Sequence, residues 1–190
     1  KFKFRDFNEK KIFQEVQKKL KFPVVIKPIN EGSSVSVYIC KKNNFFSNLK
    51  KLRHYDEILI EKFIPGREIQ VAILGNEKLG VIELKPKRKF YDYEAKYNPK
   101  AKTEHIIPVN ISKKNYDKVT SIALKAHKLL KCRGVTRSDF RFDGKKFYLL
   151  ETNTQPGMTA LSLVPEIARY RNISFAKLID KILLDASINK

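Results

Sequence analysis

Several features that would place a 190-residue chain in a special class are missing from this sequence. Its two cysteines, Cys40 and Cys132, exclude a disulfide scaffold, and no CxxC pair or Cys/His cluster indicates a zinc site. No apolar run approaches the roughly 18–20 residues of a membrane span, and the opening KFKFRDFNEK lacks the apolar stretch of a signal peptide. These absences predict a cytoplasmic protein with no membrane partner. The only methionine is Met158, so we expect a piece of a larger protein, cut on its N-terminal side.

Acidic residues are scarce: 20 Asp and Glu stand against 40 Lys and Arg, for a formal net charge of +20. Such a charge is compatible with nucleic-acid binding. The lysines, however, are spread along the whole chain, often as doublets such as Lys10-Lys11 and Lys145-Lys146. This distribution is typical of a solvated surface, so we predict no specific nucleic-acid partner. A basic nucleic-acid-binding module stays open as an alternative from another class.

Hydrophobic periodicity predicts an α+β chain with mainly antiparallel strands. Helices are expected over residues 9–20, 43–54, 112–131, 162–170 and from 174 onwards. Strands are expected over residues 24–27, 35–40, 57–63, 67–74, 79–84, 135–142 and 146–150. Residues 85–110 show little periodicity.

Candidate metal ligands concentrate in the stretch RSDFRFDGKKFYLLETNTQPG, which covers residues 137–157. A hairpin folded about residues 143–146 places Asp139 opposite roughly position 150, close to Glu151. Glu151 and Asn153 can point the same way if the chain is extended. Two carboxylates and one amide oxygen form a hard-oxygen set that suits magnesium. Ion pairs of these carboxylates with the neighbouring arginines or lysines are the alternative.

Two further segments are compatible with a nucleotide. Lys27 ends a predicted strand and precedes Gly32, Ser33 and Ser34, a loop whose backbone N–H groups can face a phosphate. An ordinary hairpin tip explains that loop equally well. The extended stretch 61–68 offers backbone groups to an adenine edge and Glu68 to ribose hydroxyls, although a plain crossing strand accounts for it too.

Taken in order, five segments resemble the ATP-grasp fold and, within it, the D-alanine–D-alanine ligase family. They are FPVVIKPINEGSSVSV (22–37), ILIEKFIPGREIQVAILG (58–75), FYDYEAKY (90–97), GVTRSDFRFD (134–143) and FYLLETNTQPGMTALSLVPEIAR (147–169). The resemblance implies two α+β lobes with mainly antiparallel sheets that grip a nucleotide between them. Residues 1–64 would form part of the central, lid lobe, and residues 65–190 the C-terminal lobe with the metal and substrate sites.

The resemblance also implies roles for individual residues toward ATP. Lys27, Ser33, Ser34 and Lys96 are similar to residues on the nucleotide phosphates. The positions that resemble the adenine linker and the ribose carboxylate are Glu61, Lys62, Ile64 and Glu68. Tyr97 resembles an omega-loop tyrosine that shares a hydrogen-bond network with the Ser33 counterpart, which also orients substrate.

Metal, catalytic and substrate roles follow from the same resemblance. Asp139, Glu151 and Asn153 are similar to the ligands of two magnesium ions, with manganese as an alternative ion. Arg137 and the backbone N–H of Gly157 resemble groups that stabilise the charged intermediate. Ser162 and Leu163 resemble the residues that bind the carboxylate of the second D-alanine.

The implied activity is ATP-dependent synthesis of D-alanyl-D-alanine through an acylphosphate, for peptidoglycan precursors. The family's N-terminal lobe has no counterpart among these residues, so we expect this chain by itself to be inactive or weakly active. The family implies a homodimer for the intact protein. The alternatives are another ATP-grasp carboxylate–amine ligase or a D-alanine–D-lactate ligase. Tyr97 disfavours the latter, since depsipeptide ligases tend to change the omega-loop tyrosine.

Overall fold

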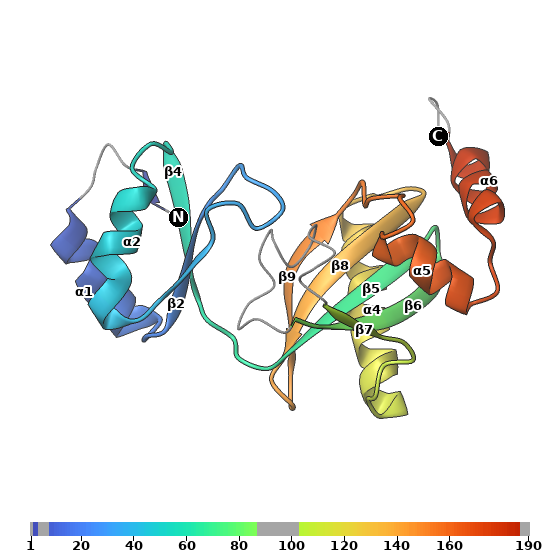
Figure 1. The fold of residues 1–190 in the computed structure, drawn as a ribbon, viewed down its shortest axis with the longest axis horizontal. Helices are drawn as coiled ribbons and strands as arrows, with labels where there is room; N and C mark the ends of the chain where they lie inside the picture. Colours follow the sequence, from blue (N-terminus) through green and yellow to red (C-terminus); the bar gives the residue numbers. More distant parts are fainter. Residues whose placement is uncertain (1, 4–7, 87–102, 187–190) are drawn as a thin grey trace. The chain divides into compact units, whose positions relative to one another are not determined.

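The computed structural model describes residues 2–3, 8–86 and 103–186. The chain divides into two compact units, and the boundary falls between Phe63 and Ile64 (Figure 1). The first unit holds the residues up to Phe63, and the second holds Ile64–Lys85 and the chain from Glu104 onwards. Within the described ranges, no helix combines the length and the apolar character needed to cross a membrane.

The first unit is a four-stranded antiparallel sheet with two helices against one face (Figure 1). The strand order is β1 (Phe2–Lys3), β4 (Glu57–Lys62), β2 (Val24–Pro28) and β3 (Tyr38–Cys40). The helices are α1 (Glu9–Lys19) and α2 (Phe45–Lys51), the latter preceded by the 3₁₀ turn η2 (Lys42–Asn44). Asn8 caps α1, because its side-chain oxygen accepts a hydrogen bond from the backbone N–H of Lys11 at 3.1 Å.

The core of the first unit lies between the sheet and the two helices. Val24 and Ile26 on β2 are fully buried there with Phe45 of α2. Since successive side chains of a strand point to opposite faces, Lys27 on β2 and Glu61 on β4 lie on the face away from the helices. These two candidate nucleotide-binding residues therefore lie on the face of the sheet opposite the hydrophobic core.

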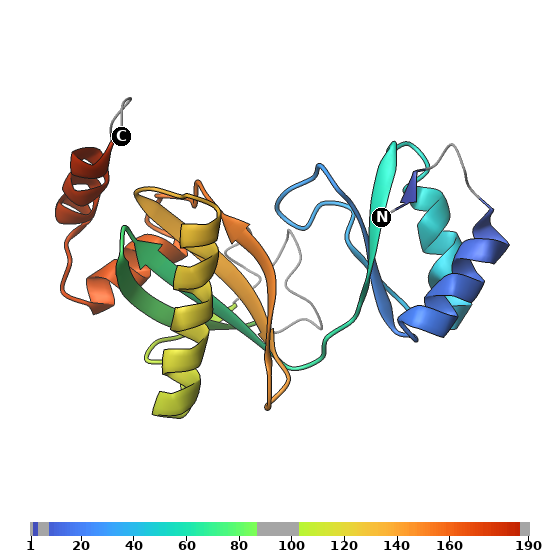
Figure 2. The same ribbon diagram turned by 180° about the vertical axis from the view of Figure 1, so that it is seen from behind.

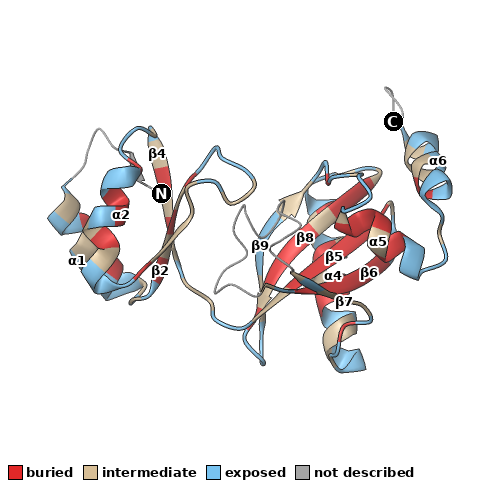
Figure 3. Ribbon diagram, in the orientation of Figure 1, coloured by how far each residue is buried: buried red, intermediate tan, exposed pale blue. Residues whose placement is uncertain are grey.

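The second unit is a five-stranded antiparallel sheet covered on both faces (Figures 1 and 2). Its strand order is β7 (Glu104–Ile106), β6 (Glu77–Lys85), β5 (Arg67–Leu74), β8 (Val135–Phe142) and β9 (Phe147–Asn153). Its helices are α4 (Lys113–Leu129), α5 (Leu163–Tyr170) and α6 (Phe175–Asp185). Figure 3 shows the central strands buried and the edge strand β9 more exposed.

The two faces of this sheet differ in character. Ile69, Val71 and Phe140 pack with Val119 of α4 in one apolar core. The alternate residues of the same strands face α5: a Cβ added to Gly80 would come within 2.6 Å of Ile167. Strand periodicity places Gln70, Arg137 and Asp139 on this second face.

The predicted α+β class with mainly antiparallel strands is confirmed. Two short strands, β1 and β7, were not predicted, because segments of two and three residues are too short to show a period. The predicted strand 35–40 is wrong in its first half, since pairing begins only at Tyr38. Ser36 has a φ of 56°, outside the extended region, so the chain cannot be a regular strand there. A helix is present within the predicted range 43–54, but it is shorter, since α2 covers only Phe45–Lys51.

Gly66 joins β4 to β5 in a conformation that a side chain would not tolerate. Its φ is +114°, and a Cβ there would lie 2.2 Å from the carbonyl oxygen of Phe142. We predict that Gly66→Ala lowers the free energy of unfolding by about 2 kcal/mol or more, since backbone strain and a clash combine. Gly75 is the matched control, because its φ is +57° and a Cβ there would meet nothing within 4 Å. Gly75→Ala should cost about 1 kcal/mol. Equal losses in urea unfolding of the two variants would contradict the prediction.

His127 of α4 is buried, and its Nδ1 lies 2.9 Å from the hydroxyl of Thr136. Burial disfavours the imidazolium and lowers the pKa of His127 from its ordinary 6.5. As the pH falls below 6.5, the unfolded chain takes up the proton first, so stability should decrease until the pH passes the folded pKa. We expect His127→Gln to weaken this loss between pH 7.5 and 5.5, and the exposed His54→Gln to leave it unchanged. Unfolding curves with the same pH slope in all three proteins would refute this.

Candidate functional site

The turn between β8 and β9 is built around Asp143. One carboxylate oxygen accepts hydrogen bonds from the backbone N–H groups of Lys145 and Lys146 at 2.8 and 2.7 Å. The other accepts from the hydroxyl of Tyr148 at 3.0 Å. These hydrogen bonds lower the pKa of Asp143, with the bond from Lys146 first among the causes. The charged side chain thus ties the turn together and helps set how the two strands pair.

The pairing of β8 with β9 brings the predicted acidic residues together. Asp139 lies directly opposite Glu151, and Arg137 lies opposite Asn153. The pairing register shifts between Asp139 and Phe140, where Leu150 is the extra residue. The simple hairpin pairing of Asp139 with position 150 is therefore off by one. Directly opposed residues share a face, so Arg137, Asp139, Glu151 and Asn153 all face the α5 side.

Arg137 neutralises one of the two facing carboxylates. Its Nε and Nη2 donate to the two oxygens of Asp139 at 2.8 and 3.0 Å, and both side chains are mostly buried. Like charges directly opposite each other in a sheet are destabilising, and a bidentate arginine offsets that cost for Asp139 and Glu151. The alternative expected from the sequence, an ion pair with a neighbouring arginine, is present for Asp139. It does not exclude a metal, because a carboxylate accepts several contacts.

Gln70 belongs to this site and was not predicted. It lies on β5 opposite Asp139, is 1% exposed, and its buried side-chain oxygen has no hydrogen-bond partner. Such an atom costs free energy unless something binds it. One signal in the sequence could have found it: a single amide in the otherwise apolar run IQVAIL (69–74).

The donor set fits magnesium. Two carboxylates and the amide of Asn153 share one face, and Gln70 adds an amide oxygen next to Asp139. These are hard oxygen ligands of the kind that magnesium prefers. Within residues 2–3, 8–86 and 103–186, no three His, Cys, Asp or Glu side chains converge on a metal-sized site. Magnesium is commonly held by only one or two carboxylates, with waters and substrate phosphates in the rest of its shell.

In the first unit, Lys27 and Glu61 form an ion pair of 2.6 Å across β2 and β4. The loop after β2 holds Ser33 and Ser34 at positive φ angles of 51° and 61°, conformations that non-glycine residues rarely adopt. Strain of this kind clusters at ligand-binding loops. Lys62, one residue after Glu61, is the last residue of β4, and its side chain is exposed.

In the second unit, Ile64 and Glu68 are both held by Arg141. The guanidinium donates to the carbonyl oxygens of Ile64 and Gly66 at 3.1 and 2.6 Å, and to the carboxylate of Glu68 at 3.2 Å. The sequence indicated Ile64 and Glu68 but not the arginine that joins them. Its partner residues lie some 75 positions away along the chain, so no local pattern marks it.

Gly157 and Ser162 lie together ahead of α5. A Cβ on Gly157 would come within 2.8 Å of the Ser162 hydroxyl oxygen, so a larger residue there would require the Ser162 side chain to shift. That oxygen accepts a hydrogen bond from the backbone N–H of Thr159 at 2.9 Å instead of capping the helix. Leu163 begins α5 and is buried. Lys96 and Tyr97 lie outside the described residues.

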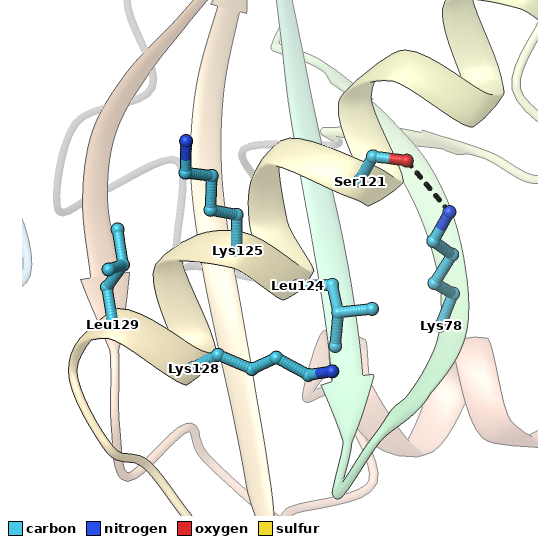
Figure 4. A pocket seen from close by; sticks show the side chains of 6 residues that line it. All are labelled: Lys78, Ser121, Leu124, Lys125, Lys128 and Leu129. Carbon is cyan, nitrogen blue, oxygen red and sulfur yellow. Dashed lines mark hydrogen bonds between the residues drawn. The ribbon is translucent and has the colours of Figure 1, made fainter.

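A cavity of about 380 Å³ lies beside α4, and Figure 4 shows the side chains around it. It is lined by Lys78, Ser121, Leu124, Lys125, Lys128 and Leu129. Lys78 donates to the hydroxyl of Ser121 at 2.9 Å. This cavity presents lysines and no carboxylate, and it lies on the α4 side of the sheet, away from Asp139. Its lysines would repel a cation, so it is a poor site for magnesium.

Residues 2–184 match the family model described as D-ala D-ala ligase C-terminus. The chain belongs to the D-ala D-ala ligase C-terminus family. The resemblance inferred from the five sequence segments is thus confirmed, and so is the ATP-grasp fold. The family match covers both units, with the paired carboxylates of β8 and β9 and the serine-containing loop after β2.

Relatives and solved structures point the same way. The D-alanine–D-alanine ligase of Pelagibacter ubique is 66% identical over 192 residues, covering 99% of this chain and 63% of that protein. Two structures of the D-alanine–D-alanine ligase from Bacillus anthracis, the second complexed with ATP, match with TM-scores of 0.78 and 0.76 at 35% and 29% identity. They cover 91% and 95% of this chain and 57% and 56% of their own.

The VanG D-Ala:D-Ser ligase from Enterococcus faecalis matches with a TM-score of 0.80 at 28% identity, covering 96% of this chain and 54% of its own. This chain thus spans 54–63% of the length of these proteins.

The two facing carboxylates should contribute differently to stability. Asp139→Asn removes the carboxylate charge that pairs with the mostly buried Arg137, and we expect a loss of about 2–3 kcal/mol in the free energy of unfolding. Glu151 is exposed and faces a like charge, so Glu151→Gln should change stability by no more than about 0.5 kcal/mol. Urea unfolding without metal or nucleotide measures both. Equal losses would show that the Arg137–Asp139 pair does not carry the difference.

Proposed function

We propose that this chain is the nucleotide- and metal-binding part of an ATP-dependent, ADP-forming ligase that joins two D-alanines for peptidoglycan precursors. The observation that carries the proposal is the shared face of Arg137, Asp139, Glu151 and Asn153, a magnesium-compatible set beside an arginine. The family match over residues 2–184 and the 66% identity to a D-alanine–D-alanine ligase support it.

We propose that Asp139, Glu151 and Asn153 hold two magnesium ions, with Gln70 as a further oxygen ligand or the partner of a metal-bound water. Magnesium, when bound there, neutralises phosphate charge and shares its shell with phosphate oxygens. Arg137 is held in place by Asp139, and its positive charge is then available to oxygens that become negative during the reaction.

The nucleotide residues proposed from the family pattern are Lys27, Ser33, Ser34, Glu61, Lys62, Ile64, Glu68 and Lys96. Lys27 supplies a positive charge to phosphate, and its ion pair with Glu61 holds it in position before ATP arrives. Backbone groups of the segment up to Ile64 bind adenine, and Glu68 accepts ribose hydroxyls.

The proposed reaction has two steps. A carboxylate oxygen of the first D-alanine attacks the γ-phosphorus of ATP, which forms an acylphosphate and releases ADP. The amine of the second D-alanine attacks the acyl carbon, phosphate leaves, and the amine loses a proton.

The proposed residue roles follow these steps. Arg137 and the N–H of Gly157 stabilise the intermediate. Ser33 and Tyr97 orient substrate, and Ser162 and Leu163 bind the carboxylate of the second D-alanine. Positioning and charge carry such a reaction, since no protein group forms a covalent bond.

We propose further that residues 1–64 are part of the lid lobe and residues 65–190 the C-terminal lobe of a cytoplasmic, homodimeric enzyme. The remaining N-terminal lobe of the relatives, which this chain does not match, would complete the first D-alanine site. The boundary between the two compact units at Phe63 and Ile64 supports the division into two lobes, and the coverage of 63% of the Pelagibacter ubique protein is compatible with a further lobe.

The choice of the second substrate has one specific competitor. The match to a D-Ala:D-Ser ligase at a TM-score of 0.80 favours D-serine as an alternative acceptor. D-Lactate is the other alternative. Rates of ADP release by the full-length protein with D-alanine alone, and with D-serine or D-lactate added at neutral pH, separate the three.

Magnesium and ATP should stabilise the full-length protein together. A ligand at 100 times its dissociation constant stabilises by about 2.7 kcal/mol. We expect a magnesium-dependent rise in the Tm with ATP, and its loss in Glu151→Gln, whose basal stability is predicted to be close to that of wild-type protein. Lys125→Gln on the far face of the sheet is the matched control and should keep the rise.

The activity test is D-alanine-dependent release of ADP with formation of the dipeptide. Wild-type protein should show both, and Glu151→Gln should lower the rate by at least about a hundredfold. A flat thermal titration together with no ADP release from wild-type protein would reject the ligase proposal.

A further inference from the structure

Arg141 connects three groups that precede or begin β5. It donates to the carbonyl oxygens of Ile64 and Gly66 and to the carboxylate of Glu68. Glu68 lies directly opposite Arg141 in the β5–β8 pairing. The side chains of both residues are mostly buried, at 16% and 13% exposure, so water screens their ion pair weakly.

The two carbonyl groups that Arg141 holds lie in the connection between β4 and β5. Residues 63–66 belong to neither β4 nor β5, so no sheet ladder fixes their carbonyl groups. A planar guanidinium presents up to five N–H donors in a fixed fork, and here Nε, Nη1 and Nη2 each serve a different acceptor. One side chain on a rigid strand therefore sets the position of two carbonyls and one carboxylate.

We propose that Arg141 is a positioning residue for the adenosine part of ATP. This inference rests on the proposed function, in which residues up to Ile64 bind adenine and Glu68 binds ribose. A carboxylate accepts up to about four hydrogen bonds, so the bond from Arg141 is compatible with ribose hydroxyls as additional donors. Arg141 orients Glu68 before the nucleotide binds and lowers the entropy lost on binding.

The variants separate the parts of this role. Arg141→Met keeps the length of the side chain and removes every donor. Arg141→Lys keeps the charge beside Glu68 but cannot reach three acceptors at once with the same geometry. Arg53→Met is the matched control, because Arg53 pairs with Glu9 in the first unit, whereas Arg141 and residues 64–68 belong to the second unit.

The test compares kcat/KM for ATP with that for 2′-deoxy-ATP, using full-length protein and saturating D-alanine. In wild-type protein, kcat/KM should be about tenfold higher for ATP than for 2′-deoxy-ATP. This factor corresponds to the loss of one hydrogen bond to a charged group. Arg141→Met should reduce this preference below about threefold and raise the KM for ATP about tenfold, with the KM for D-alanine unchanged. Arg141→Lys should fall between, and Arg53→Met should match wild type. A fall in the amount of folded enzyme lowers both rates equally, so the ratio does not report folding.

Other outcomes would overturn either the positioning role of Arg141 or the proposed function. A wild-type preference retained in Arg141→Met, or in Arg141→Lys if the Met variant does not fold, overturns the positioning role. Equal use of the two nucleotides by wild-type protein also overturns it, because the contact of Glu68 with the ribose 2′-hydroxyl that Arg141 is proposed to position is then absent. Both results leave the ligase proposal intact. The absence of any D-alanine-dependent ADP release from wild-type protein would instead reject the proposed function itself.

Discussion

The register between β8 and β9 is the constraint on which the candidate site depends. In a strand the side-chain period is two, so a shift of one residue moves every side chain to the other face. With uninterrupted pairing from the turn, Asp139 would face position 150, and Glu151 would lie on the α4 side. The extra residue Leu150 returns Glu151 and Asn153 to the face of Asp139. A single bulge thus decides whether the oxygen ligands converge.

Lysine and arginine carry different roles in this molecule. Lysines outnumber arginines along the chain, whereas three arginines of the second unit pair with carboxylates within the sheet. Arg67 makes a bidentate pair with Glu83, and Arg137 and Arg141 hold Asp139 and Glu68. Arginine suits this use, because its fork matches a carboxylate and is more weakly hydrated than an ammonium. The net charge of +20 therefore says little about function, and the placement of a few arginines says much more.

The segment from Ile64 to Glu68 shows how backbone and side chains act together. Gly66 lets the chain pass against the backbone of Phe142, where a Cβ would clash. That close approach brings the carbonyls of Ile64 and Gly66 within reach of Arg141. The conformational freedom of Gly66 and the donors of Arg141 thus hold residues 64–66, which lie between β4 and β5 and belong to neither strand. In the proposed function, a nucleotide would meet this segment already ordered.

The sequence by itself determined the α+β class, most strands and helices, and the family, because alternation, helical spacing and five motifs are local along the chain. It also identified Asp139, Glu151 and Asn153 as neighbours. Only the tertiary structure decided the bulge at Leu150, the pairing of Arg137 with Asp139, and the unsatisfied amide of Gln70. These features depend on strands that are distant in sequence and adjacent in the sheet. Register and burial arise from packing between elements, and a pattern within one element does not encode them.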